Sequence, residues 1–178
     1  MDRDAYRPSP TAEVACETTD GRATLVFVRD LRHPPATVWA ALTDPARLAE
    51  WAPFLADRDL GSPGDAVLTM VDGDTRVDQP TTVRRAEPPH LLEYVWGDDL
   101  LRWELTPTAG GTRLTLRHTT ADPTVVPMVA AGWHICLDVA AHLLDGDPVG
   151  PIRGMEALDF GWEGLRDAYA QRLGLGLG

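Results

Sequence analysis

One histidine lies among apolar residues where it could do chemistry. His118 alternates with Leu114 and Leu116 in a strand-like segment, so the three side chains share one face, which we expect to be the interior. A histidine there could orient a ligand or transfer a proton. The alternative, which we favour, is a histidine near solvent at a strand end or one satisfied by a backbone group.

Arg29 is the second candidate. It is in phase with Leu25, Phe27 and Leu31, so its guanidinium is expected to point inward and to need a carboxylate or a ligand anion. The competing interpretation is a strand-end arginine whose head reaches water past its own methylene stem. The sequence does not separate the two.

Three polar residues follow one another at helical spacing. Asp138 lies four residues from both His134 and His142. Two turns of helix span about 12 Å, which is too wide for three ligands to hold one ion. We therefore interpret the row as a solvated helix face and predict no metal site.

Other residue types known for catalysis lack their partners. Ser9 and Ser62 lie in loops without a nucleophile-elbow motif, and Gly110-Gly111 suits a hairpin turn, not a phosphate loop. We predict no catalytic residue and no cofactor.

The elements that must position these side chains are mostly short antiparallel strands. Strand-forming residues between turn signals predict them over 12–31, as one or two strands, and over 66–71, 75–86, 91–96, 100–106 and 112–120. Alternation places Tyr94 and Trp96 on one face, with Trp103 and Leu116 inward on the next strands. The aromatic face is expected to line the interior.

Helices are expected on either side of these strands. Prolines and helical spacing predict two short helices at 35–42 and 46–51, a long helix over 125–145 and a final helix over 155–173. The long helix is apolar over so wide an arc that it must be covered on more than one side, and it carries Trp133 and Cys136. We predict one domain over 12–173, a flexible tail over 1–11 and a frayed tail over 174–178.

Charge and cysteine content exclude several classes of protein. The 178 residues hold 16 Lys and Arg against 27 Asp and Glu, a net charge of −11, which disfavours nucleic acid and anionic membranes as partners. Cys16 and Cys136 form no CxxC pair, which argues against a disulfide scaffold. With no apolar signal core and no transmembrane run expected, a cytoplasmic location follows by elimination.

The order of these elements resembles the START-like (SRPBCC) superfamily with its α+β helix-grip fold, in which a curved antiparallel sheet wraps around a long C-terminal helix. The segment from Pro35 through Trp39 to Pro45, with Leu48 and Trp51, looks like the opening of bacterial proteins similar to the C-terminal domain of the activator of heat-shock-protein-90 ATPase. Residues 132–138, Gly-Trp-His-Ile-Cys-Leu-Asp, resemble that group's closing helix.

The resemblance implies a deep cavity between sheet and long helix. A cavity lined by large aromatic side chains favours a flat or branched apolar ligand. The residues expected to line it are Tyr94, Trp96, Trp103, Leu116, His118, Trp133, Cys136 and Arg29.

Three functions remain open at this point, because the superfamily hosts several. The first is a non-enzymatic binder of a small hydrophobic molecule. The second is a protein-interaction module of the co-chaperone kind. The third is an enzyme resembling the polyketide cyclases, with His118, Arg29 and Tyr94 as its polar groups. A homodimer is possible, and Leu158, Trp162 and Leu165 could serve either a dimer contact or the closing of the cavity.

Overall fold

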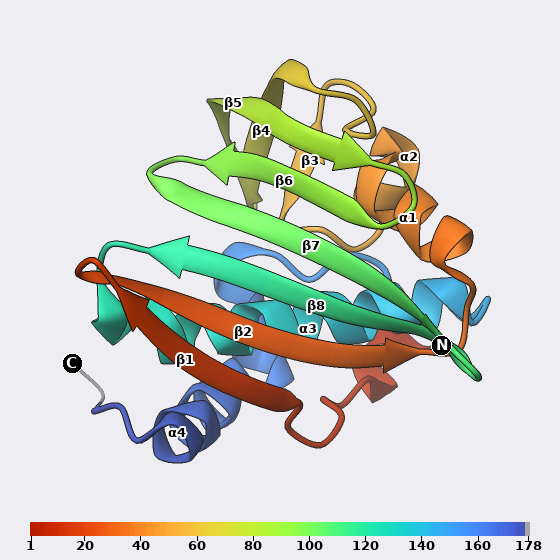
Figure 1. Cartoon of the computed structure of the whole chain (residues 1–178). Coiled ribbons are helices and arrows are strands. Elements are labelled where there is room, and N and C mark those ends of the chain that lie inside the picture. Colours follow the sequence, from red (N-terminus) through yellow and green to blue (C-terminus); the bar gives the residue numbers. More distant parts are fainter. Residues whose placement is uncertain (177–178) are drawn as a thin grey trace.

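The computed structural model describes residues 1–176 and contains one curved antiparallel sheet with a long helix packed across it (Figure 1). This is the helix-grip α+β arrangement, so the fold prediction is confirmed. The strands are β1 (Glu13–Thr19), β2 (Arg22–Leu31), β3 (Phe54–Ala56), β4 (Gly64–Asp72), β5 (Thr75–Glu87), β6 (Leu91–Trp96), β7 (Asp99–Thr108) and β8 (Gly111–Thr120). The α-helices are α1 (Pro35–Thr43), α2 (Pro45–Leu48), α3 (Val126–Leu144) and α4 (Trp162–Leu173), and the 3₁₀ turns are η1 (Arg3–Ala5), η2 (Pro123–Val125) and η3 (Gly154–Phe160).

In the sheet, the last strand of the chain lies next to one of the first two. The strand order is β1-β2-β8-β7-β6-β5-β4-β3, with every neighbouring pair antiparallel. The last strand therefore pairs with β2, with Leu116 opposite Phe27 and His118 opposite Leu25. This pairing places the end of the strand region beside its beginning, and α3 follows directly.

Alternation along the strands determines the inner face. Leu92, Tyr94, Trp103, Leu116 and His118 are all buried on the concave side, as their spacing predicts. The opposite face carries ion pairs, in which Arg102 contacts both Glu93 and Glu104.

The helices cover this inner face from both ends. Asp44 accepts a hydrogen bond from the Ala46 N–H at 2.9 Å and caps α2, whose first residue is Pro45. In Figure 1, α1 and α2 lie near the β3 and β4 end of the sheet, while α4 packs on α3 and against β1.

The helix α3 with its preceding turn is long and apolar enough to cross a membrane by length and composition, although the sequence was expected to hold no such segment. In the structure 67% of its most apolar window is buried inside the protein. It is thus the central helix of the core, enclosed between the sheet and α4.

The predicted helix over 155–173 is divided in two. Gly161 adopts φ +83°, a left-handed conformation, and separates η3 from α4. Gly174 and Leu175, placed in the predicted frayed tail, instead close α4 through hydrogen bonds from their N–H groups to the carbonyls of Gln171 and Ala170. Residues 177 and 178 of that tail lie outside the described residues.

Substitution of Trp103 tests how tightly this core is packed. Trp103 is 1% exposed and contacts Trp51 and Trp133 edge-on. Replacing Trp103 by Ala leaves a cavity and is expected to lower the free energy of unfolding by about 3–5 kcal/mol in urea titrations. The half-exposed Trp162, replaced by Ala, is the control and should cost much less. Equal losses would contradict this assignment of Trp103 to the core.

Candidate functional site

A cavity of about 660 Å³ lies between the inner face of the sheet and α3. Met70 of β4, Gln79 of β5 and Trp96 of β6 form its sheet side, and Trp133 lies on the helix side. The remaining wall comes from residues 152–162, the segment that follows α3. The cavity thus exists because the chain returns over the open end of the sheet after its long helix.

Aromatic rings make up the main apolar surfaces of the cavity. Trp96 and Trp133 lie with ring centroids 5.7 Å apart and their planes at 64°. Trp162 lines the cavity from the first residue of α4. Three indoles around one space favour a planar, largely apolar guest.

A chain of hydrogen bonds fixes part of this surface. The Nε1–H of Trp133 donates to Nδ1 of His118 at 2.9 Å, and Nε2 of His118 lies 2.8 Å from the carboxylate of Asp99. Because an indole N–H can only donate, Nδ1 of His118 must accept, and its proton is on Nε2, facing Asp99. Both ring nitrogens of His118 are therefore engaged.

The carboxylate of Asp99 lines the same cavity in ionised form. Burial alone would raise its pKa, but hydrogen bonds from His118 and Thr120 and the nearby charge of Arg22 lower the pKa below its ordinary value. In the sequence Asp99 follows Gly97-Asp98, a turn signal that by itself indicates only turn chemistry.

The residues predicted to line a cavity divide into three groups. Trp96, His118, Trp133 and Cys136 line it. Three others, Tyr94, Trp103 and Leu116, are buried behind these residues as core. Trp103 donates its indole N–H to the Tyr94 hydroxyl at 3.2 Å, which satisfies both polar groups. Arg29 lies elsewhere, in a separate polar cluster.

Several lining residues carried no signal in the sequence. Among them are Met70, Gln79, Asp99, Arg153 and Gly154. The last two belong to the proline- and glycine-marked connection, which carries no periodic pattern pointing to the sheet. Trp162 lines the cavity, which is one of the two roles that the sequence left open for it.

Cys136 does not offer a nucleophile at neutral pH. Burial raises the pKa of its thiol to about 12, with nearby Arg153 acting weakly in the opposite direction. The thiol therefore stays protonated and acts as a small apolar wall. Within residues 1–176, no three His, Cys, Asp or Glu side chains are placed to hold a metal ion.

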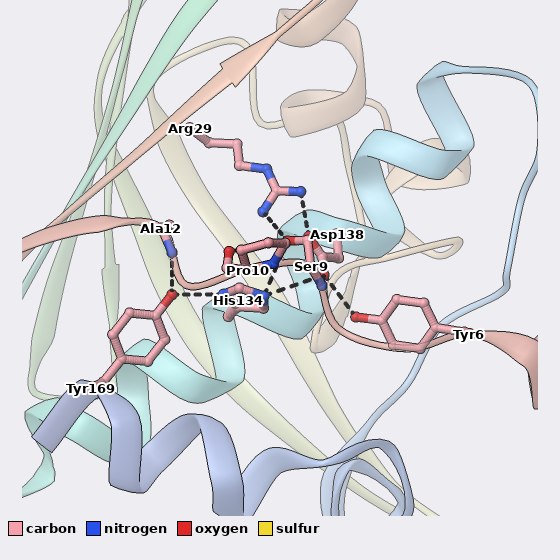
Figure 2. A network of polar contacts seen from close by, with 8 residues as sticks. All are labelled: Tyr6, Ser9, Pro10, Ala12, Arg29, His134, Asp138 and Tyr169. Carbon is pink, nitrogen blue, oxygen red and sulfur yellow. Dashed lines mark hydrogen bonds and ion pairs between the residues drawn. The ribbon is translucent and has the colours of Figure 1, made fainter. Parts of the chain in front are cut away.

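A second polar group, the Asp138 cluster, lies between the N-terminal segment, β2, α3 and α4 and consists of Tyr6, Ser9, Arg29, His134, Asp138 and Tyr169 (Figure 2). The predicted solvated face of α3 is wrong here, because His134 is 0% and Asp138 2% exposed. The wide apolar arc of α3 already indicated that other parts of the chain pack on several sides of it. His134 and Asp138 are buried on one of these sides.

Asp138 is the common acceptor of the cluster. Its carboxylate accepts hydrogen bonds from the Ser9 hydroxyl at 2.7 Å, the Ser9 N–H at 2.8 Å and the Tyr6 hydroxyl at 3.1 Å. Arg29 forms an ion pair with it, and Nε2 of His134 lies 3.3 Å away. Burial opposes ionisation, but these contacts outweigh it and hold the pKa of Asp138 far below its ordinary value.

The contact between His134 and Tyr169 extends the cluster to α4. The Tyr169 hydroxyl accepts from the Ala12 N–H at 2.9 Å and lies 2.6 Å from Nδ1 of His134. Arg29 is thus directed inward with a carboxylate partner, as one of the two sequence interpretations required. None of the cluster residues lines the cavity.

The predicted flexible tail over 1–11 is also wrong. Tyr6 is 1% exposed, and Ser9 bonds to Asp138 through both its backbone and its hydroxyl. Charge and proline content suggested a loose segment, but the partner of this segment lies on α3, about 130 residues later in the chain. The Asp138 cluster therefore anchors the N-terminal segment.

The cluster predicts a pH-dependent contribution to stability. Asp138→Ala leaves Arg29 without its buried partner and is expected to lower the free energy of unfolding at pH 7 by about 3–5 kcal/mol. A carboxyl whose pKa is lowered by folding stabilises the native state above its unfolded pKa, about 3.9, and loses this contribution as the pH falls toward the folded value. The gap between wild type and variant in urea titrations should therefore shrink below about pH 4.

A matched control is Asp74→Ala, in the exposed turn between β4 and β5. It removes the same charge and should leave stability nearly unchanged at either pH. A constant gap between wild type and Asp138→Ala across the acid range would contradict the proposed ionisation of Asp138.

Several solved structures share this fold. The conserved protein of unknown function EF2215 from Enterococcus faecalis is 16% identical, with 90% of each chain covered and a TM-score of 0.68. CalU16 from Micromonospora echinospora is 22% identical, with 90% of this chain and 95% of that chain covered and a TM-score of 0.64. The AHSA1-like protein from Aeromonas hydrophila is 21% identical over 69% of this chain and 92% of its own, with a TM-score of 0.59. At such identities the likeness shows the fold alone.

The family comparison covers the central part of the chain. A search of curated proteins gives no significant match. The family model for Activator of Hsp90 ATPase homolog 1-like protein matches residues 32–145, from the end of β2 to the end of α3. That span is more than half of the chain and includes α1, β3 to β8 and α3. The protein therefore belongs to the Activator of Hsp90 ATPase homolog 1-like (AHSA1-like) family.

Proposed function

We propose that this protein binds a small, flat, mostly apolar molecule in the cavity between the sheet and α3, and does not transform it. The observation that carries the proposal is the cavity of about 660 Å³ lined by Trp96, Trp133 and Trp162. Its size is within the range of about 300–1,000 Å³ that is usual for small-molecule sites.

The cavity walls are held in place without a ligand. His118 fixes the indole of Trp133, and Asp99 in turn fixes His118. Trp133 also packs edge-on against Trp103, with ring centroids 5.2 Å apart. A preformed surface of this kind favours binding, because little side-chain freedom is lost when a ligand enters.

The same contacts argue against acid–base catalysis by the cyclase-like route. A catalytic histidine needs a nitrogen free to exchange a proton with the ligand. Both nitrogens of His118 are engaged by Trp133 and Asp99, while Tyr94 donates no group to the cavity and Arg29 lies in the Asp138 cluster. Binding is therefore the function that these residues support best.

The expectations on partners remain predictions. Because the net charge is −11, we expect that the protein does not bind nucleic acid or anionic membranes. The cytoplasmic location also stays a prediction. A homodimer through the segment after α3 also stays a prediction. There Trp162 lines the cavity and Leu165 is buried, while Leu158 is exposed.

Gly132 offers a direct test. It lies on α3 at the cavity, where an added Cβ would meet only Nε1 of Trp162 at 4.0 Å. Gly132→Leu should therefore narrow the cavity beside Trp162 without disturbing the helix, and fluorescence titration with the neutral apolar probe N-phenylnaphthylamine should show weaker binding than in wild type. Stability should hold or rise, since leucine is the better helix former.

The control variant is Gly164→Leu on α4, where an added side chain meets open space. It should bind the probe as wild type does. Native mass spectrometry of freshly purified wild type, compared with Gly132→Leu, would also detect any co-purified molecule as an adduct that is less abundant in the variant. Undiminished probe binding by Gly132→Leu would overturn the proposed site.

A further inference from the structure

Arg153 differs from the other polar residues that line the cavity. Its Nε–H donates to the carbonyl of Ala52 at 2.8 Å, and its Nη2 donates to the carbonyl of Ala49 at 2.7 Å. These two bonds orient the guanidinium fork against the backbone that follows α2. The third nitrogen, Nη1, forms no hydrogen bond to any residue from 1 to 176, although Arg153 borders the cavity.

Arg153 also has no carboxylate partner. Within residues 1–176, no Asp or Glu oxygen lies within 4.0 Å of its guanidinium, whereas Arg3 and Arg29 form such pairs. Several other arginines also lack a pair, for example the exposed Arg76 and Arg84, but Arg153 lines the cavity. The side chain is half-buried, and burial lowers the pKa of Arg153. An arginine nevertheless keeps its charge at neutral pH in proteins. The cavity wall therefore carries a fixed cation that the protein leaves without a counterion.

The charged groups around Arg153 do not neutralise the positive charge of its guanidinium. Arg76 of β5 adds charge of the same sign, and Cys136 on α3 is a neutral thiol at pH 7. Two acidic residues act on it from farther away, Glu50 after α2 and Glu156 on η3. Glu156 is already paired with Arg3 at 2.6 Å. This part of the cavity thus favours an anion although the whole chain is strongly acidic.

The cavity has a second, oppositely charged region. Asp99 is linked through His118 to Trp133, whereas Arg153 lies near Cys136, one turn farther along α3. The ring of Trp96 packs against both His118, which binds Asp99, and Trp133, so these two indoles lie at the Asp99 end of the cavity. A ligand with an aromatic body and one acidic group would therefore place its acid at Arg153 and away from Asp99.

We propose that the natural ligand is a planar aromatic acid, whose ring packs against Trp96 and Trp133 and whose ionised oxygen accepts a hydrogen bond from Nη1 of Arg153. This inference rests on the proposed function and adds the chemical class of the ligand. Its physical basis is that an ionised acid supplies the counterion and the acceptor that the half-buried guanidinium lacks.

Two probes with one skeleton test the inference separately from the cavity itself. Anilinonaphthalene sulfonate and N-phenylnaphthylamine share their aromatic rings and differ in the anionic group. Wild type should bind the sulfonate more tightly than the neutral probe. In Arg153→Gln, fluorescence titration should show the affinity for the sulfonate falling roughly tenfold to hundredfold, the range for one charge-assisted hydrogen bond, with the affinity for the neutral probe nearly unchanged.

Further variants complete the design. Arg153→Lys keeps the charge and should retain most of the preference for the sulfonate. If circular dichroism shows Arg153→Gln to be unfolded, Arg153→Met replaces it, because methionine also removes the charge and keeps an apolar stem, and the same loss of preference is expected. Arg32→Gln removes one positive charge at an exposed site outside the cavity and should leave both affinities unchanged.

The outcomes separate the two proposals. If the neutral probe binds and Gly132→Leu weakens that binding, but the preference for the sulfonate is the same in wild type and Arg153→Gln, the acidic-ligand inference is overturned and the binding function stands. A preference lost equally in Arg32→Gln would also overturn it, because net charge would then explain the effect. Failure of both probes to bind wild type would overturn the proposed function itself.

Discussion

The buried carboxylate of Asp138 holds together four segments that are far apart in the sequence. It lies on α3 and receives hydrogen bonds from the N-terminal segment and an ion pair from Arg29 of β2, while His134 links it to Tyr169 of α4. A buried carboxylate is stable only when its charge and lone pairs are satisfied. Through these partners the cluster connects α3 to β2 of the sheet, to the N-terminal segment and to α4.

The cavity and the Asp138 cluster use the same helix in different ways. Near Asp138, α3 is covered by the N-terminal segment and α4, and its polar groups are all engaged. On the side of Trp133 and Cys136 the helix borders the cavity, and Trp133 contacts the sheet through His118. The cluster thus anchors α3 on a side that does not border the cavity. A rigid frame around an unfilled volume is what a preformed ligand site requires.

Sequence reasoning was accurate where a short period or a local signal determined the structure. The two-residue alternation placed Tyr94, Trp103 and His118 on the inner face, and proline with helical spacing predicted the short helices after β2. It was wrong where the partner lies far along the chain. The row around Asp138 was assigned to solvent because it is too wide to hold one metal ion, and the sequence does not show that Ser9 and Arg29 reach it. The break of the final helix at Gly161 was not predicted, because the conformation of a glycine-rich connection is decided by the surface that it covers.

The closing wall of the cavity lies outside the part of the chain that defines the family. The family match ends at residue 145, while Arg153, Gly154 and Trp162 come after it. The sheet and α3 belong to the family match, whereas part of the cavity wall belongs to the segment after it. A protein with the same sheet and α3 but a different segment after α3 would enclose a different volume with a different charge. Under the proposed binding function, the choice of ligand could therefore change by exchange of the C-terminal segment, with no substitution in the core.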